Sequence, residues 1–511
     1  MNFENIELAD TKPVDQDVLD LVALGHDQAF SRKFNLWSLL ALAFCVLGSW
    51  GAISSDLATG FSSGGPVIIL WGLVLVALCN LCVVLSLGEL CSSMPSALGQ
   101  AYYVFRLCNS PTGRFLSYMC AWINVFGWWT ATATLVAFNT NFLLGMKLMF
   151  DPEWDGISQG WLSFVVYLGL SLMVTIVNVV SCRKDPVLPW LNNVMGVGFA
   201  ALFIVFSLAF LISVATSTHL SFRTPTFVFG TWTNQTGWND VVTWFLGLLQ
   251  SAYGLTAFDS VIHMAEEIPD PRRNVPKAMY LAILSGAGTS FAFMVICLVC
   301  LPDETTIADH PSGLPFIGLA QQIVGLQGAF ALVALFTIIS IGQNISVATT
   351  ASRMTWGFAR DGGFPWSRYF SHVDPVWKAP VRATWAQGFI IALVGVLYLF
   401  STTVLQAIVS VSSIALMISY GLPIATLLII GRDKLNPGPF RLGKWGTTLN
   451  YVSVVTCTVV SIFFFFPNTP KPGGSDMNYA IAVFGAMLLV SLTFWFLKGR
   501  HTYFRIELSR P

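Results

Sequence analysis

The sequence predicts an all-α integral membrane protein with about twelve transmembrane helices. The 511 residues are 55% hydrophobic and only 10% charged, whereas soluble domains carry about 25% charged residues. The mean hydropathy is +0.69. The apolar residues gather in runs of about 20 or more, the length that a helix needs to cross a bilayer. The chain is therefore expected to lie in a lipid bilayer. Its net charge of zero gives no sign of a nucleic-acid partner.

The apolar runs give the expected spans in chain order. We place them at 34–58, 66–90, 115–149, 161–181, 188–215, 241–267, 278–301, 325–359, 383–400, 402–430, 447–467 and 478–498. The third and eighth runs exceed one crossing, which favours tilt or extra turns outside the bilayer. A short interfacial helix is expected before the eighth span, at residues 311–324.

These spans divide the chain into a tail at 1–33, a transporter domain at 34–498 and a second tail at 499–511. The first tail is polar and acidic, without the basic and then apolar pattern of a cleaved signal peptide. Inside the domain, residues of about 34–215 and 238–430 are expected to form two repeats of five spans in opposite orientation. Spans 11 and 12 occupy about 447–498.

Lysine and arginine predict the orientation. With the N-terminus inside and twelve spans, all basic residues except Lys147, Arg223 and Lys471 fall in the tails or in inside loops. This asymmetry follows the positive-inside rule, so both termini are expected in the cytosol. The protein is expected in the plasma membrane. The sequon Asn234-Gln235-Thr236 then lies in an outside loop. Asn234 is a candidate for glycosylation.

Two spans contain poor helix formers near their middle. The first carries Gly48-Ser49-Trp50-Gly51, and the sixth carries Gly254 followed by Asp259. A glycine inside a helix costs about 1 kcal/mol relative to alanine, and an acid at membrane depth indicates a functional site. Interrupted helices at matching places in two halves are typical of the substrate site of a secondary transporter. The alternative is that the glycines serve helix–helix packing.

An interruption would expose backbone groups that a continuous helix keeps bonded. Amides near Ser49 to Gly51 are expected to bind an anionic group such as a carboxylate, and carbonyls at 252–254 an ammonium group. Helices 1 and 6 are thus expected to be broken at the midplane. The candidate substrate-binding residues are Gly48, Ser49, Trp50, Gly51, Tyr253, Gly254, Thr256 and Asp259.

Acids and a histidine follow the second interruption at helical spacing. Asp259, His263 and Glu267 are four residues apart, so a regular helix would place them on one face. Histidine titrates near neutral pH, which makes this stripe a candidate path for a coupling proton. In the alternative, Asp259 only caps a helix, His263 bonds a carbonyl, and the glutamates contact Arg272 or Arg353. Candidate coupling or gating residues are His263, Glu266, Glu267 and Arg353.

Four stretches carry a resemblance to a known family. They are Leu24–Phe34, Ser86–Pro95, Glu266–Ala278 and Ser352–Pro365. Together they resemble fungal amino acid/choline permeases of the amino acid–polyamine–organocation superfamily. The resemblance implies twelve spans, a five-plus-five inverted repeat and uptake of small amine-bearing solutes.

Residue roles also follow from this resemblance. It implies that Gly48 to Gly51 hold the substrate carboxylate or main chain, that Tyr253 is an aromatic gate and that Asp259 is the acid of span six. Two features depart from the pattern. Trp50 stands where bacterial relatives usually have a small residue, and 188–215 lacks the lysine that some proton-coupled relatives carry in span five.

The expected function is secondary active transport, by proton-coupled alternating access, of an amino acid (including γ-aminobutyrate) or choline. The sequence leaves the choice of solute open. An exporter of a small nitrogenous metabolite and a non-transporting nutrient sensor are the alternatives. No span carries a channel's continuous polar stripe, and no cluster resembles a catalytic site. No cofactor or metal is expected, because the CxxC pairs at Cys79/Cys82 and Cys297/Cys300 lie inside apolar runs, where packing explains them.

Overall fold

The computed structural model is all-helical over the residues that it describes, which are 16–23, 25–302, 314–399, 404–473 and 477–504. Parts of the two expected tails, 1–15 and 505–511, and the start of the expected interfacial helix at 311–313 lie outside these ranges. The α-helices are α1 Gln16–Ala23, α2 Leu36–Leu47, α3 Ser49–Ser55, α4 Leu57–Ser62, α5 Gly65–Val67, α6 Leu73–Ser93, α7 Gln100–Leu107, α8 Pro111–Phe150, α9 Gly160–Ser181, α10 Val187–Thr216, α11 Pro225–Gly230, α12 Asp240–Gly254, α13 Pro271–Val299, α15 Pro315–Arg360, α16 Ser367–Phe370, α17 Val381–Gly395, α18 Val404–Ile430, α19 Gly446–Phe463, α20 Ala480–Phe494 and α21 Arg500–Thr502.

Twelve of the described segments are long and apolar enough to cross a membrane, which confirms the predicted number. They are Leu36–Ser55, Gly65–Ser93, Pro111–Phe150, Gly160–Ser181, Val187–Thr216, Asp240–Val261, Pro271–Val299, Pro315–Arg360, Val381–Leu399, Ser410–Ile430, Gly443–Phe463 and Ala480–Thr502. Each overlaps one predicted apolar run. The crossings are helical because backbone groups in hydrocarbon must be hydrogen-bonded within their own segment, and a helix achieves this.

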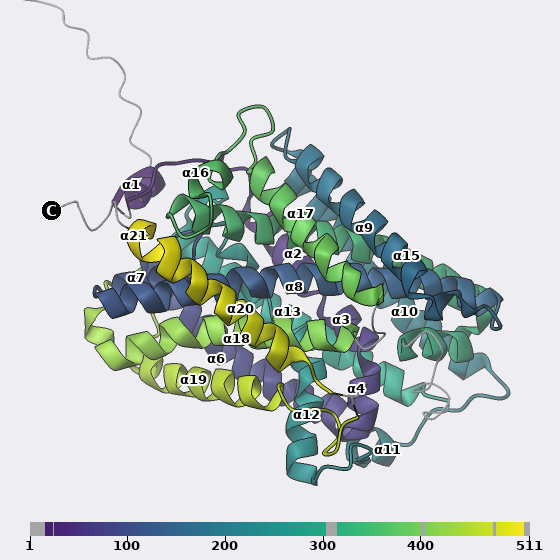
Figure 1. Ribbon diagram of the computed structural model, residues 1–511. Helices are drawn as coiled ribbons and strands as arrows, with labels where there is room; N and C mark the ends of the chain where they lie inside the picture. The colour runs from purple at the N-terminus through teal and green to yellow at the C-terminus, as the bar shows by residue number, and fades with distance from the viewer. Residues whose placement is uncertain (1–15, 24, 303–313, 400–403, 474–476, 505–511) are drawn as a thin grey trace, which may run out of the picture.

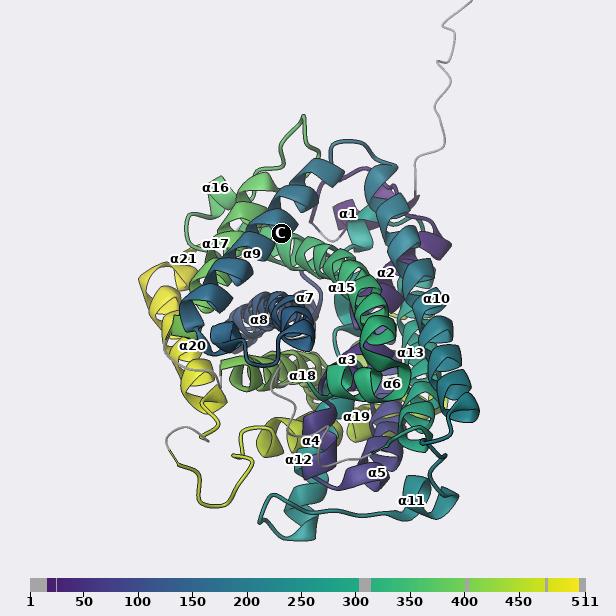
Figure 2. The same cartoon turned by 90° about the vertical axis from the view of Figure 1, so that its right-hand side faces the viewer.

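Helix α8 lies in the middle of the bundle. It packs against α7, α9, α15 and α18, and Figure 2 shows it nearly end-on between α9, α15 and α18. Helix α13 packs against α2, α3 and α6. The segments that carry the candidate site therefore meet inside the bundle rather than at its lipid-facing surface.

The first and last described helices lie at the same end of the bundle, which we call the tail end. Figure 1 shows α1, α7, α16 and α21 together there. Phe105 of the α7 segment stacks on Phe504 with ring centroids 4.0 Å apart, and the Phe504 amide donates to the Asp361 carbonyl. An even number of crossings requires this arrangement.

The first and sixth spans depart locally from helical geometry. Helix α2 ends at Leu47, Gly48 adopts the left-handed conformation (φ 51°, ψ 31°), and α3 begins at Ser49. Helix α12 ends at Gly254, and Ala257 is also left-handed (φ 71°). A left-handed residue cannot continue a right-handed helix, so the chain changes direction at both places.

The prediction of a regular helix after the second interruption is wrong. Residues 258–267 contain two short 3₁₀ turns, Phe258–Val261 and Ala265–Glu267, and no regular α-helix. The predicted stripe of three groups on one helix face therefore does not form as such. In the eighth span, Gly325 (φ 73°, ψ 174°) separates residues 315–324 from the long part of α15, near the expected boundary.

Candidate substrate site and its ion pairs

A small cavity lies between the two interruptions. Its volume is about 30 Å³, room for about one or two water molecules. The described residues that line it include no charged side chain, and its polar groups come from Tyr253, Thr256, Gln343, Ser412 and Ser413. The full lining is Val46, Leu47, Ala52, Ala131, Leu135, Tyr253, Thr256, Ala257, Gln343, Val347, Ser412, Ser413 and Leu416. The first, third, sixth, eighth and tenth spans thus all contribute to it.

Gly254 lies in close contact with α3. A Cβ at this position would meet Ile53 Cγ1 at 2.4 Å and the Ser49 carbonyl oxygen at 3.2 Å. No side chain fits there without a shift. The glycine therefore allows the two interrupted spans to pack against each other, which is the packing role weighed as the alternative.

Side-chain amides donate hydrogen bonds to backbone carbonyls beside the interruptions. Asn80 Nδ2 donates to the Leu255 carbonyl at 2.9 Å, and Gln343 Nε2 to the Val46 carbonyl at 3.4 Å. The Ala252 carbonyl accepts from Thr256 Oγ1 and from the Leu255 amide. These bonds replace helix partners that the interruptions remove.

Trp50 lies in an aromatic cluster and not in the cavity. Its ring is fully buried and lies 4.7 Å from Phe199, 4.9 Å from Phe293 and 5.6 Å from Phe336, between centroids. Gly51 faces the same cluster, since a Cβ there would meet Phe336 at 2.7 Å. Among the expected substrate residues, Tyr253 and Thr256 line the cavity, whereas Gly48, Ser49, Trp50, Gly51, Gly254 and Asp259 do not.

Asp259 is fully buried at the centre of a hydrogen-bond network. Gln100 Nε2 donates to Oδ2 at 2.7 Å and the Tyr420 hydroxyl donates to Oδ1 at 2.6 Å. Asn124 Nδ2 and Trp128 Nε1 lie 3.4 Å from Oδ2. Both carboxylate oxygens are therefore occupied by protein donors, which leaves little capacity for a substrate amine.

His263 completes this network and defines a proton position. Its Nδ1 lies 2.8 Å from the Ala97 carbonyl oxygen, and its Nε2 lies 3.0 Å from Asp259 Oδ2. A carbonyl can only accept, so Nδ1 carries a proton. The second contact then needs one more proton, on either Nε2 or the carboxyl. The His263–Asp259 pair thus holds one exchangeable proton in a buried position.

Tyr420 connects this pair to the cavity. Its hydroxyl donates to Asp259 Oδ1 and accepts from the amide of Ala257 at 3.2 Å. Ala257 lines the cavity and is the left-handed residue of the second interruption. Three bonds therefore lead from the proton position to the cavity wall.

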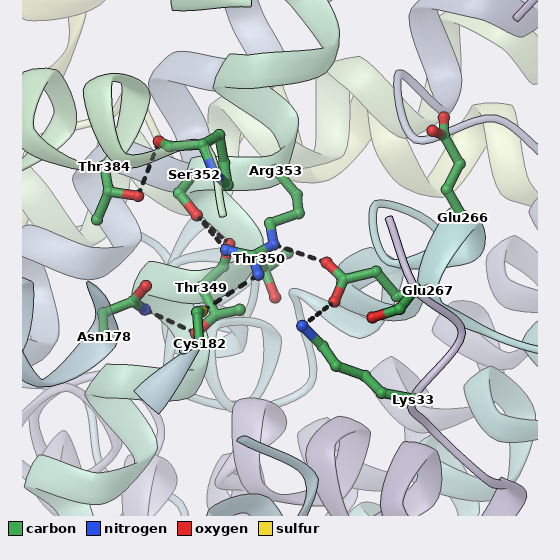
Figure 3. Close-up of polar contacts among 12 residues, drawn as sticks. Lys33, Asn178, Cys182, Glu266, Glu267, Thr349, Thr350, Ser352, Arg353 and Thr384 are labelled. Carbon is green, nitrogen blue, oxygen red and sulfur yellow. Dashed lines mark hydrogen bonds and ion pairs between the residues drawn. The ribbon is translucent and has the colours of Figure 1, made fainter. Parts of the chain in front are cut away.

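A second network ties the chain after the interruption to its neighbours. Arg353 Nε donates to Glu267 Oε1 at 2.8 Å, and Lys33 Nζ lies 2.7 Å from Oε2. Figure 3 shows Glu267 between these two cations, with Arg353 also reaching Ser352 and Cys182. All three charged side chains are at most 3% exposed. Burial alone would raise the pKa of Glu267, but Arg353 and Lys33 hold that pKa below its usual value.

Glu266 points away from that cluster (Figure 3) and pairs with another arginine. Arg360 Nη1 donates to both of its carboxylate oxygens, at 2.7 and 2.9 Å. The sequence predicted contacts of the two glutamates with Arg272 or Arg353. The described residues show the Arg353 contact with Glu267, and Arg272 Nε donates to the Ser92 carbonyl at 2.9 Å. Consecutive acids thus hold two different turns of α15 against the residues that follow the second interruption.

The sequence did not identify Gln100, Asn124 and Tyr420, which contact Asp259. It also did not identify Asn80, which donates to the Leu255 carbonyl. Asn80 and Asn124 are amides inside apolar runs, a signal that was available. Tyr420 carried no such signal, because tyrosine is common in membrane helices. Asn234 is exposed, and its Nδ2 donates to the Trp238 carbonyl at 2.8 Å.

Comparison with known proteins identifies the family. The model of a family described as "Amino acid permease" matches residues 34–487. The chain belongs to the amino acid permease family. It is therefore a multi-pass membrane protein of a transporter family and not an enzyme.

Individual relatives of this permease cover nearly its full length. It is 31% identical over 502 residues to a choline transporter of Saccharomyces cerevisiae, with 98% of this chain and 87% of the relative covered. It is 30% identical over 450 residues to a putative amino acid/polyamine transporter of Macrophomina phaseolina, covering 87% and 97%. Amino-acid permease 2 of Neurospora crassa is 26% identical over 489 residues, covering 94% and 88%.

Proposed function

We propose that this permease takes up a small amine-bearing solute, choline or an amino acid such as γ-aminobutyrate, by alternating access coupled to protons. The observation that carries this proposal is the cavity between the two interruptions, lined by five spans that converge inside the bundle. A relative named as a choline transporter supports choline as the first solute to test.

The site is built from two helices broken near the midplane, as in an inverted repeat of residues of about 34–215 and 238–430. The local geometry at Gly48 and at residues 255–257 supports this, since each place has a left-handed residue between helical segments. Tyr253 and Thr256 contact the solute. The break at Gly48 orients the first amides of α3, at Ser49 to Gly51, as the N-terminus of a helix that can bind an anionic group. Gly254 keeps the two breaks together, and Trp50 fixes α3 in the aromatic cluster.

The coupling proton resides on the His263–Asp259 pair. Because Tyr420 joins Asp259 to the Ala257 amide, a change in protonation alters a bond at the cavity wall. Loss of the proton would leave the carboxylate facing a neutral histidine acceptor, and the contact would weaken. The unwound segment then takes a different position, which changes the shape of the cavity.

The two glutamate ion pairs close the tail end. Glu267 with Arg353 and Lys33, and Glu266 with Arg360, bridge the second interruption to α15 and to the start of the first span. Opening the cavity toward the tail end requires these pairs to separate. The tail end faces the cytosol of the cell, the protein lies in the plasma membrane, and Asn234 on the opposite side carries a glycan.

Uptake by purified protein in liposomes tests the proposal. Radiolabelled choline should enter, and unlabelled choline, γ-aminobutyrate and polyamines should compete to different extents. A matched liposome preparation without protein gives the background. If none of these amines enters above that background, the proposed function is wrong.

A further inference from the structure

Asp56 is a carboxylate that the proposed mechanism leaves unused. It follows Ser55, the last residue of α3, and connects α3 to α4. Its Oδ1 accepts from the Thr59 hydroxyl at 2.8 Å. Its Oδ2 is buried and has no hydrogen-bond partner among the described residues. A buried carboxylate oxygen without a donor is unfavourable, so a structural role alone explains it poorly.

The position of Asp56 relates it to the cavity. Ala52 lines the cavity, and Asp56 follows four residues later, which is one helical turn along the same side of α3. Its charge also acts on the hydroxyl of Tyr253, another lining residue. Asp56 therefore lies one turn beyond the lining residue Ala52, farther from the tail end, and within electrostatic reach of the lining residue Tyr253.

The other charges near the cavity are already satisfied. Asp259 has donors on both oxygens, and Glu266 and Glu267 are held by arginine or lysine. The described lining contains no lysine, arginine or histidine that would pair with a substrate carboxylate. The unsatisfied charge next to the cavity is thus negative, and it is complementary to a cation.

The cavity of about 30 Å³ is too small for an amine of several carbon atoms, so it must widen to accept one. Widening along α3 from Ala52, beside Tyr253, would join the cavity to Asp56. A cation placed there meets a carboxylate on one side and an aromatic ring on the other, the combination that binds quaternary ammonium groups.

We propose that Asp56 holds the positive group of the substrate and that the substrate class is a small organic cation without a carboxylate. Thr59 positions the carboxylate through its hydroxyl. This inference rests on the proposed function, because it names the substrate contact of the same site.

The test compares ligands that differ only in charge. In liposomes containing the full-length protein, choline and its uncharged isostere 3,3-dimethyl-1-butanol compete with radiolabelled choline. The wild type should bind choline at least about tenfold more tightly than the isostere. The trimethylammonium group has no N–H to donate, so the contact is an ion pair, and Coulomb attraction to the carboxylate contributes about one to two orders of magnitude. γ-Aminobutyrate should compete at least about tenfold more weakly than choline.

The variants then locate the charge. Asp56→Asn removes the negative charge, so it should weaken choline binding about ten- to hundredfold and leave binding of the isostere unchanged. The exposed acid Asp151, which pairs with Lys147 at 3.0 Å, provides the control: Asp151→Asn should not change either affinity. Should Asp56→Asn fail to reach the membrane, the wild-type comparison still decides, because equal affinities for choline and the isostere exclude a charge contact.

Two failures are distinguishable. If the wild type takes up choline but Asp56→Asn retains its affinity within about twofold, or γ-aminobutyrate competes as well as choline, this inference is overturned while the proposed function stands. If the wild type takes up no amine at all, both are overturned.

Discussion

The substitution Gly254→Ala examines the contact between the two interrupted spans. The added Cβ would lie 2.4 Å from Ile53 Cγ1, whereas ordinary van der Waals contact begins at 3.4 Å. The helices must therefore separate by about 1 Å in this region. Overpacking of this kind costs about 1–3 kcal/mol, and alanine regains less than about 1 kcal/mol of helix propensity at the end of a helix. A net cost of about 1–2 kcal/mol corresponds to about a five- to thirtyfold change in an equilibrium.

A double-mutant cycle separates packing from ligand approach. Ile53→Ala removes Cγ1, so adding it to Gly254→Ala should restore much of the stability, with an interaction energy of about 1 kcal/mol or more. Ile53→Val keeps Cγ1 and is the matched control that should not rescue. The readouts are the melting temperature of the purified protein and the choline uptake per molecule in liposomes. Normal stability and uptake in Gly254→Ala, or equal rescue by alanine and valine, would refute the packing role.

Three further predictions concern the charged groups. His263→Gln should abolish choline accumulation driven by a pH gradient but keep exchange of labelled for unlabelled choline. The control His372→Gln, at an exposed histidine, should leave both activities intact. Gradient-driven accumulation by His263→Gln would contradict the assignment of the coupling proton to the His263–Asp259 pair. Glu267→Gln leaves Arg353 and Lys33 buried without their anion, which costs about 3–5 kcal/mol. The tail end should therefore open more often, and labelling of Cys182 by a maleimide, mapped by mass spectrometry, should increase. Unchanged labelling would argue against closure of the tail end by these ion pairs. Burial raises the pKa of the Asp56 carboxyl to about 7, and only its charged form attracts a cation. Asp56 acts on a titratable neighbour, Tyr253. Equilibrium choline binding should therefore strengthen as pH rises through about 7 in the wild type, and Asp56→Asn should lack this rise while keeping the pH dependence that comes from the His263–Asp259 pair. Equal pH profiles in the two proteins would exclude Asp56 as the titrating group.

The spans were predictable because each is a local property of the chain. A run of about 20 apolar residues is sufficient evidence for a crossing, and glycines such as Gly48 and Gly254 mark places where a helix is weak. The exact form of the second interruption was not predictable. The 3₁₀ turns at 258–267 are maintained by contacts to Gln100 and Tyr420, which are more than 150 residues away in the chain.

The candidate site shows the same limit. Helical spacing correctly suggested that Asp259 and His263 meet, because four residues is a local distance. Spacing said nothing of the aromatic rings that enclose Trp50, which come from α10, α13 and α15. Asp56 was overlooked because an acid at the end of an apolar run resembles a boundary. Its significance depends on Tyr253, almost 200 residues later, and on Oδ2 having no donor among the described residues.

Proton-driven accumulation of choline is the sharpest test of proton-coupled uptake by this permease. Liposomes containing the wild-type protein, in sodium-free buffer, receive a pH gradient that drives protons inward, and internal choline is measured over time. Internal choline should rise above its external concentration and fall back when a protonophore is added. If choline only equilibrates under the proton gradient and accumulates only when a sodium gradient is supplied, coupling to protons is contradicted.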